Sequence, residues 1–497
     1  MDYQQLLLAL LPDLLVVVAL FAALGVDYSR MRGSRLAKRY QVACQISAAG
    51  LIAGLVVIVL QIAGTMSVMA STADGQLVLN TGTLTLKALL FAMGLGVLPL
   101  AKRDQITPQV SEYFALLLLA TLGMGFVVTS RNLLGAFVAL ELVSLSLYAM
   151  TVLNQAKRAS AEAALKYLTF GAVASGFLLF GLSYLYGATG QLDLTQMTGL
   201  QHSPLLVLAY LLIFVGLGFK LALAPFHLWA PDVYQNAPTP VAGWIGSGSK
   251  IAAAGLLVAL LQPVFDAPKL KEALIPALAA LAVLSMVVGN LGALRQTNLK
   301  RLLAYSAIAN AGYLLVGVVA FSAAGNASVI FYIVVYSLAS LGAFGVIAVL
   351  TDTLGREAEI SDFNGCWKTT PGLAVAFLVF VLSLAGIPPL AGFLGKFYLF
   401  FAAIGAAPEA ATWHDGFYWL VAFALIMSVV SLYYYLRVLK AFLITPADDG
   451  AAIAPSKIGW AAGVTLCVLA LAVVALGLWP EPLLGLLQTD SGIANRR

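Results

Sequence analysis

Charged side chains are scarce in this sequence, because Asp, Glu, Lys and Arg together make up 10% of its 497 residues, whereas 61% are hydrophobic. The mean hydropathy is +0.96. A soluble protein of this length needs far more polar surface to cover its core. Apolar stretches of about 20 residues recur along the chain, and each is long enough to cross about 30 Å of hydrocarbon. The sequence therefore predicts an all-α polytopic membrane protein.

Cysteine and histidine are also rare, with three residues of each. The cysteines are far apart and form no CxxC pair, which excludes an iron–sulfur cluster or a zinc site built within this chain. The histidines are too scattered to suggest a metal or haem site, and no NAD-binding fingerprint is present. We therefore expect no cofactor and no metal in this chain. The residues concerned are Cys44, Cys366, Cys467, His202, His227 and His414.

Fourteen membrane-spanning helices are predicted from the apolar stretches. They lie near residues 6–26, 42–64, 84–100, 111–129, 133–153, 163–187, 204–227, 241–262, 273–293, 299–321, 327–350, 371–401, 417–442 and 457–479. Of the 27 basic residues, 17 fall in loops on one side, five in loops on the other side and five inside spans. Because Lys and Arg concentrate in cytoplasmic loops, we expect both termini on the periplasmic side of a bacterial inner membrane. The sparsely charged side carries only Arg131, Lys269, Lys271, Arg496 and Arg497.

Ionisable residues inside the spans are the first functional candidates. A lysine at mid-membrane costs several kcal/mol unless it is paired, hydrated or neutral. A row of lysines with different partners is suited to exchange protons, and this is the physical core of the functional prediction. Glu141 is the only clear intramembrane acid and a candidate counter-ion for one lysine. The five lysines are Lys87, Lys166, Lys220, Lys250 and Lys396.

The depth of each charge in its span separates surface contacts from functional candidates. Lys87 lies within about one turn of the start of its span, where we expect it to extend to the surface. Asp13 lies close to a span end, where hydration is easy. Lys166 is also one turn into its span, so a channel entrance and a surface contact fit its position equally well. Lys220 and two further lysines, Lys250 and Lys396, are deeper, and for them a functional role is favoured.

Two of the lysine-bearing spans contain helix breakers. Pro225 follows Lys220 in GLGFKLALAPFHLWAPD, and a glycine and two prolines precede Lys396 in LSLAGIPPLAGFLGKF. Proline removes a backbone donor and frees carbonyls, which buried protein or water must satisfy. The broken helices are spans 7 and 12, so we predict two inverted five-helix repeats, spans 4–8 and 9–13, each with one discontinuous helix. The predicted domains are a three-helix segment (1–105), the first repeat (106–265), the second repeat (266–445) and a final helix with a short tail (446–497).

Two further residues lie near this pair of repeats. Lys250 lies between them in span 8, VAGWIGSGSKIAAAG, which is predicted to form one helix. His227 follows Lys220 by seven residues, on roughly the same helix face, and is a candidate proton relay. A histidine that is hydrogen-bonded at the helix end fits His227 equally well.

The segment GFKLALAPFHLWAPDVYQNAPTPVAGWIGSGSKIAA resembles the central part of the antiporter-like subunits of respiratory complex I. That family shares ancestry with multisubunit cation/proton antiporters and membrane-bound hydrogenases. The resemblance covers roughly residues 110–440. PDVYQNAPTPV is similar to the N type, and so is LSLAGIPPLAGFLGKF, in which Lys396 stands where the M type has a glutamate.

The resemblance implies a hydrated proton relay along the middle of the membrane, coupled to quinone reduction in neighbouring subunits. Its members in this sequence are Glu141, Lys166, Lys220, His227, Lys250 and Lys396. The resemblance also implies that Glu141 pairs with Lys220. The resemblance also implies that NADH, FMN, iron–sulfur clusters and quinone are bound by partner subunits. The implied partners are an M-type neighbour, the small K, J, A and H types, the lateral helix of the L-type subunit, and the lipid bilayer.

Two other classes of function also fit the sequence. One is a component of a Na⁺/H⁺ antiporter, although a sodium site prefers clustered carboxylates and carbonyls, and one buried glutamate among lysines is a poor match. The other is a purely structural membrane subunit, which would tolerate neutralisation of the deep lysines. A respiratory complex and a photosynthetic relative with a different electron donor fit the motifs alike.

Overall fold

The computed structural model confirms the all-α membrane architecture, and it describes residues 3–66, 71–72, 76–154, 157–351, 354, 356–409, 412–447 and 458–488. Within these residues, thirteen spans are long and apolar enough to cross a membrane. Two shorter apolar helices, Pro371–Ala385 and Ala391–Ala406, provide one further crossing. The total agrees with the fourteen predicted spans. Lys457 and the predicted tail beyond residue 488 lie outside the described residues.

The bounds of the helices follow the predicted spans within a few residues. The long helices are α1 (Tyr3–Val26), α2 (Leu36–Ile62), α3 (Thr81–Asp104), α4 (Val110–Thr129), α5 (Leu133–Val152), α6 (Arg158–Thr189), α7 (Pro204–Leu221), α11 (Pro268–Leu294), α12 (Leu299–Val319), α13 (Ala323–Thr351), α17 (His414–Leu443) and α18 (Trp460–Leu478). The shorter ones are α8 (Trp229–Asn236), α9 (Thr239–Gly246), α10 (Gly248–Leu261), α14 (Cys366–Thr369), α15 (Pro371–Ala385), α16 (Ala391–Ala406) and α19 (Glu481–Gln488). A small antiparallel hairpin pairs β1 (Ser71–Thr72) with β2 (Leu77–Val78).

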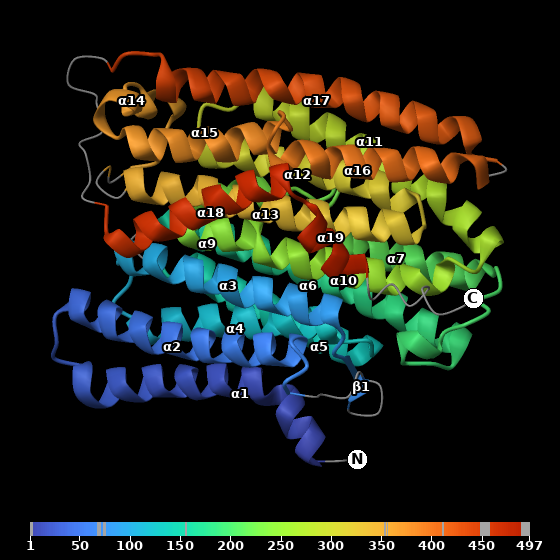
Figure 1. Ribbon diagram of the computed structural model, residues 1–497, viewed down its shortest axis with the longest axis horizontal. Coiled ribbons are helices and arrows are strands. Elements are labelled where there is room, and N and C mark those ends of the chain that lie inside the picture. Colours follow the sequence, from blue (N-terminus) through green and yellow to red (C-terminus); the bar gives the residue numbers. More distant parts are fainter. Residues whose placement is uncertain are drawn as a thin grey trace.

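The helices lie side by side in approximate chain order, from α1 and α2 at one edge of the bundle to α17 at the opposite edge (Figure 1). α18 and α19 run back across one face of the bundle, where they contact α3 and α13. The central helices α12 and α13 are almost completely enclosed, whereas α17 and α18 are largely exposed. The exposed apolar faces of the outer helices are therefore available to lipid or to partner subunits.

Capping chemistry sets the beginnings of two helices that border the site. The hydroxyl of Ser203 accepts a hydrogen bond from the N–H of Leu206 (3.2 Å), and Pro204 occupies the first turn of α7. The side chain of Asn298 accepts from the N–H of Arg301 (3.0 Å) at the start of α12. Ser and Asn at the N-cap satisfy backbone donors that have no partner in the helix, and proline fits the first turn because it needs no such partner.

Three spans are interrupted, one more than the sequence predicts. The two predicted breaks follow α7 and α15, and each contains a cis X-Pro peptide bond. The third divides span 8 into α9 and α10 at Ser247, whose backbone leaves the helical region (φ −124°, ψ −81°). The prediction of one continuous helix there is wrong. Glycines on both sides of Ser247 weaken the helix, and a Cβ at Gly248 would lie 2.7 Å from Trp244.

Candidate functional site

The first predicted break leaves a backbone carbonyl available inside the membrane. Lys220 is the last residue but one of α7, which Ala222 ends in the left-handed conformation (φ +61°). The N–H groups of Ala222 and Leu223 return to carbonyls of the last helical turn, at 3.0 and 2.7 Å. This Schellman arrangement satisfies the earlier terminal carbonyls and leaves the carbonyl of Leu221 for another donor.

The ammonium group of Lys250 occupies that position. Its Nζ donates to the carbonyl oxygens of Leu221 (3.0 Å) and Ala307 (3.1 Å). Lys250 is only 1% exposed, and no carboxylate of the described residues lies within ion-pair distance of it. The C-terminus of α7 is the negative end of the helix dipole, which favours a cation. The broken helix thus supplies a partial counter-charge in place of an acidic side chain, since none of those described pairs with Lys250.

Lys396 is held in the same way at the second predicted break. α15 ends at Ala385, and Gly386 follows in the left-handed conformation (φ +85°) with a Schellman cap of the same pattern. Nζ of Lys396 donates to the carbonyls of Ala385 (3.0 Å) and Leu384 (3.3 Å), and the ring of Tyr313 lies 4.8 Å away. Glycine suits position 386 because its positive φ strains residues with a Cβ, and a Cβ there would also lie 3.0 Å from Cδ of Lys396. Both breaks therefore bind a buried lysine through their final carbonyls.

Lys220 lies beside α5 but does not pair directly with Glu141. Its Nζ donates to the hydroxyl of Ser144 and, at 3.5 Å, to that of Tyr148. The half-buried Glu141 instead accepts a hydrogen bond from Ser175 in α6 (2.5 Å). Within the described chain, the ion pair expected between Lys220 and Glu141 is absent, because the ammonium contacts the next turn of α5. Residues three apart share a helix face, so the carboxyl is one turn away from the hydroxyl that binds Lys220.

The expectation that His227 shares a helix face with Lys220 is wrong. It assumed a continuous helix, but α7 ends at Leu221 and the chain becomes helical again only at Trp229. His227 lies half-buried in the connection between these two helices. Its role as a relay stays a prediction that the helix periodicity no longer supports.

Lys166 belongs to a cluster of charges at the edge of the bundle. Its Nζ is 2.8 Å from Asp232 and 2.8 Å from Glu162, and Asp232 is also 2.7 Å from Arg301. The Lys166 side chain is 40% exposed, unlike the three deep lysines. Although burial opposes its ionisation, the two basic partners hold the pKa of Asp232 below its usual range. The structure thus connects Lys166 to α8, just beyond the first break, rather than to Glu141.

A strip of neutral polar residues lies between Lys250 and Lys396, and the sequence analysis missed it. A cavity of about 10 Å³ adjoins Lys250 and is also lined by Asn310 and Tyr332. The Tyr332 hydroxyl donates to Oδ1 of Asn310 (2.7 Å), whose Nδ2 donates to the carbonyl of Ser306 (2.8 Å). Such a volume has room for about one water molecule.

The strip continues from Ser306 toward the second break. Ser306 and the hydroxyl of Tyr435 share a hydrogen bond. Near Lys396, Asn290 donates to the hydroxyl of Tyr313 (3.1 Å) and accepts from that of Tyr434 (3.1 Å). An asparagine inside an apolar helix is the signal that could have revealed this strip, because its amide needs buried partners.

The comparisons with known proteins identify the family of the chain. A family described as NADH:quinone oxidoreductase/Mrp antiporter, transmembrane, matches residues 130–431, which is more than half of the chain. The chain belongs to this family. The match includes all three breaks and the deep lysines beside them.

Two similar proteins and one similar structure support membership of this family, and a second structure shares the fold. The protein named NADH-quinone oxidoreductase subunit N 2 of Acidobacterium capsulatum is 44% identical over 502 residues, covering 97% of this chain and 98% of the relative. Subunit N of Hirschia baltica is 43% identical, with coverage of 68% and 69%. Respiratory complex I from Thermus thermophilus with bound aureothin contains a chain of TM-score 0.79 and 34% identity, with coverage of 96% and 99%. The Mrp complex from Dietzia sp. also gives 0.79, but at 22% identity, which shows the fold alone.

In this member of the antiporter family, the expectations for Lys87 and Asp13 are wrong. Nζ of Lys87 and Oδ2 of Asp13 are 2.6 Å apart, and their side chains are 2% and 4% exposed. Lys87 does not extend to the surface, because Asp13 of α1 and the ring of Phe126 in α4, 5.5 Å away, enclose it. Glu141 is therefore not the only intramembrane acid. The pairing joins residues 74 positions apart, so no local pattern revealed it.

Proposed function

We propose that this chain is the proton-translocating N-type membrane subunit of an NADH:quinone oxidoreductase. The observation that carries the proposal is the placement of three buried lysines at interrupted helices, two of them bound to the carbonyls that the interruptions free. A group that exchanges protons must be able to lose its charge without leaving its former partner buried and unsatisfied. Carbonyls that water can also satisfy meet this condition better than a carboxylate partner does. The electron-transfer steps then belong to partner subunits that bind NADH, FMN, iron–sulfur clusters and quinone.

In the proposed mechanism, the proton moves from Lys220 to Lys250 and then to Lys396. Lys220 and Lys250 meet at the same break, because Lys250 binds the carbonyl of Leu221, the residue that follows Lys220 in the chain. From Lys250, the strip of Asn310, tyrosines and serine leads toward the second break. His227 would relay protons near the link between Lys220 and Lys250, and Lys166 would lie at the channel entrance. One turn of α5 separates Ser144 from Glu141, so a small movement of Lys220 exchanges one partner for the other.

The position of Glu141 suggests how a neighbouring subunit controls this relay. Glu141 is half-buried between α5 and α6, and apolar residues on the same side of these helices, such as Val138 and Leu145, are exposed. We propose that membrane subunits of the same complex cover this side, with an M-type neighbour, the small K, J, A and H types and the L-type lateral helix as candidates. A partner that moves α5 would change the distance between Glu141 and Lys220. In this proposal both termini are periplasmic.

Glu141→Gln is expected to impair pumping while the complex still assembles. At an effective dielectric constant of about 20, two opposite charges about 4 Å apart interact by about 4 kcal/mol, and at twice that separation by about 2 kcal/mol. Loss of an interaction of about 2 kcal/mol would change the protonation equilibrium constant of Lys220 about thirtyfold. The measurement is the number of protons pumped per NADH oxidised by inside-out membrane vesicles, in sodium-free medium and after sodium addition.

Glu272→Gln is the matched control, because Glu272 is an exposed glutamate near the start of α11. Wild-type pumping by assembled Glu141→Gln complexes would remove the acid from the mechanism. Transport that requires sodium and proceeds without any quinone substrate would instead identify the chain as a cation/proton antiporter component.

A further inference from the structure

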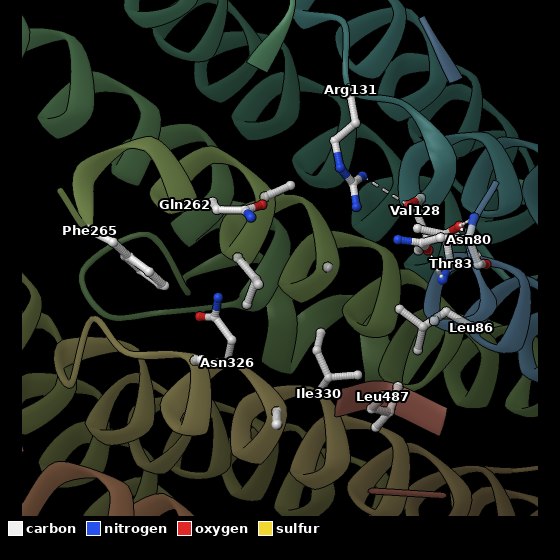
Figure 2. A pocket seen from close by; sticks show the side chains of 16 residues that line it. Asn80, Thr83, Leu86, Val128, Arg131, Gln262, Phe265, Asn326, Ile330 and Leu487 are labelled. Carbon is white, nitrogen blue, oxygen red and sulfur yellow. Dashed lines mark hydrogen bonds between the residues drawn. The ribbon is translucent and has the colours of Figure 1, made fainter. Parts of the chain in front are cut away.

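A cavity of about 110 Å³ lies where the beginnings of α3 and α13 meet the end of α10. The side chain of Arg131 extends into it from the α4–α5 connection, while Gln262 and Asn326 lie on other walls (Figure 2). One water needs about 10–15 Å³, so the cavity has room for several waters or for one phosphate-sized group. None of the described residues that line it is acidic. The described lining thus carries one positive charge and no acidic side chain.

In its contacts with the described residues, Arg131 uses one of its guanidinium nitrogens. Nη1 donates to the carbonyl oxygens of Ser130 (2.9 Å) and Val128 (3.2 Å) at the end of α4. Among the residues that the structure describes, Nε and Nη2 donate to no acceptor and no carboxylate pairs with Arg131. Burial without a counter-ion lowers the pKa of the guanidinium. The Nε–Nη2 edge therefore remains as a fork of donors, which is the geometry that binds two oxygens of a phosphate.

The surroundings of Arg131 favour an anion with an apolar part. Asn80 uses its Oδ1 to accept from the N–H of Thr83 (2.9 Å), so its Nδ2 is the atom available to the cavity. The first turns of α3 and α13 border the cavity with the positive ends of their dipoles, and the last turns of α4 and α10 border it with negative ends. Another part of the lining is apolar and includes Leu86, Ile330 and Leu487.

The charge pattern of the loops marks the same residue. Arg131, Lys269 and Lys271 are the basic residues that the described chain carries on the sparsely charged, predicted periplasmic side. Both lysines lie in the first turn of α11, outside the cavity lining. Arg131 is thus an exception to the positive-inside pattern that also faces a cavity.

We propose that this cavity binds the phosphate group of an anionic phospholipid. The Nε–Nη2 edge of Arg131 holds two phosphate oxygens, Asn80 and Asn326 border the phosphate, and the apolar wall receives the first part of the acyl region. Inorganic phosphate offers the same oxygen atoms, so the test must distinguish the two sources. The proposed site uses none of the relay residues and does not depend on the pumping mechanism.

The test uses the assembled complex in phosphatidylcholine nanodiscs that contain phosphatidylglycerol with a photoreactive diazirine near its headgroup. Cross-linked peptides are mapped by mass spectrometry for the wild type, Arg131→Gln, Asn326→Leu and the control Lys269→Gln. Labelling of residues 80–86 or 323–330 is expected to fall about tenfold or more in Arg131→Gln, the size expected for the loss of charge-assisted hydrogen bonds. Asn326→Leu is expected to reduce labelling by less, and Lys269→Gln to leave it unchanged.

Each outcome decides the assignment. Labelling that depends on Arg131 and persists in millimolar inorganic phosphate supports the phospholipid, whereas labelling that phosphate displaces overturns the lipid assignment in favour of free phosphate. Equal labelling in all four proteins overturns the anion site and leaves Arg131 as a cap of α4. Asn326→Leu keeps the contacts of Arg131 with α4 and so answers the question even where Arg131→Gln does not assemble.

Discussion

Lys250→Ala is expected to abolish proton pumping while the membrane complex remains assembled. Lys250 is the middle carrier of the proposed relay, and removing a positioned proton carrier typically slows transfer about a hundredfold or more. The vacated space joins the small cavity beside Asn310 and Tyr332, so water can reach the carbonyls of Leu221 and Ala307. The measurement is proton pumping by inside-out vesicles, with NADH:quinone turnover and the amount of assembled complex quantified in parallel.

The control for this experiment is Lys269→Ala, which removes an exposed lysine in the first turn of α11. We expect the control to pump like the wild type. Collapse of pumping and coupled turnover in the assembled Lys250→Ala complex supports the relay. Unchanged pumping and turnover would show that the central lysine is structural and that the relay is wrong at its middle link.

Asp13→Asn and Lys87→Met are each expected to destabilise the N-terminal helices strongly. Breaking a buried ion pair leaves the other charge uncompensated, at a cost of about 3–5 kcal/mol. The double variant is expected to recover most of this loss, because neutral replacements of both partners are often tolerated. Oδ1 of Asp13 supports this expectation, since it is buried without a hydrogen-bond partner among the described residues. The measurement is the yield and thermal stability of the assembled complex in a double-mutant cycle.

The same variants separate a structural pair from a proton carrier. Pumping per assembled complex should equal that of the wild type in the double variant, because the pair lies outside the proposed relay. Losses that simply add in the double variant would contradict the ion pair. A stable double variant that assembles but does not pump would instead place Asp13 and Lys87 on the proton path.

The spans and two of the breaks could be predicted because their causes are local. Runs of apolar residues set the helix lengths, and prolines near Lys220 and Lys396 end the helices wherever they are placed in the fold. The third break lies at Ser247 between two glycines, where a Cβ at Gly248 would come within 2.8 Å of Trp244 and Met124, and only the packed structure shows this crowding. The inverted relation of the two repeats and the domain limits stay predictions.

The partners of the charged residues could not be predicted, because they come from other helices. Position within a span suggested that Lys87 reaches the surface, but neighbouring helices cover that end of α3. Lys220 was expected to pair with Glu141, but it binds Ser144, which lies one turn further along the same face of α5. Neutral residues such as Asn310 resemble ordinary core positions until their hydrogen bonds are known.

The binding of Lys250 and Lys396 by helix-end carbonyls has a consequence for genetics. A scan that exchanges side chains cannot delete these acceptors, because every residue type carries a backbone carbonyl. Insertions or deletions that move the end of α7 or α15, or an amide-to-ester change after Leu221 or Ala385, would alter them directly. The side chains at these acceptor positions can therefore diverge while the proton pathway stays unchanged. Libraries of side-chain variants will not detect the backbone carbonyls that belong to the pathway.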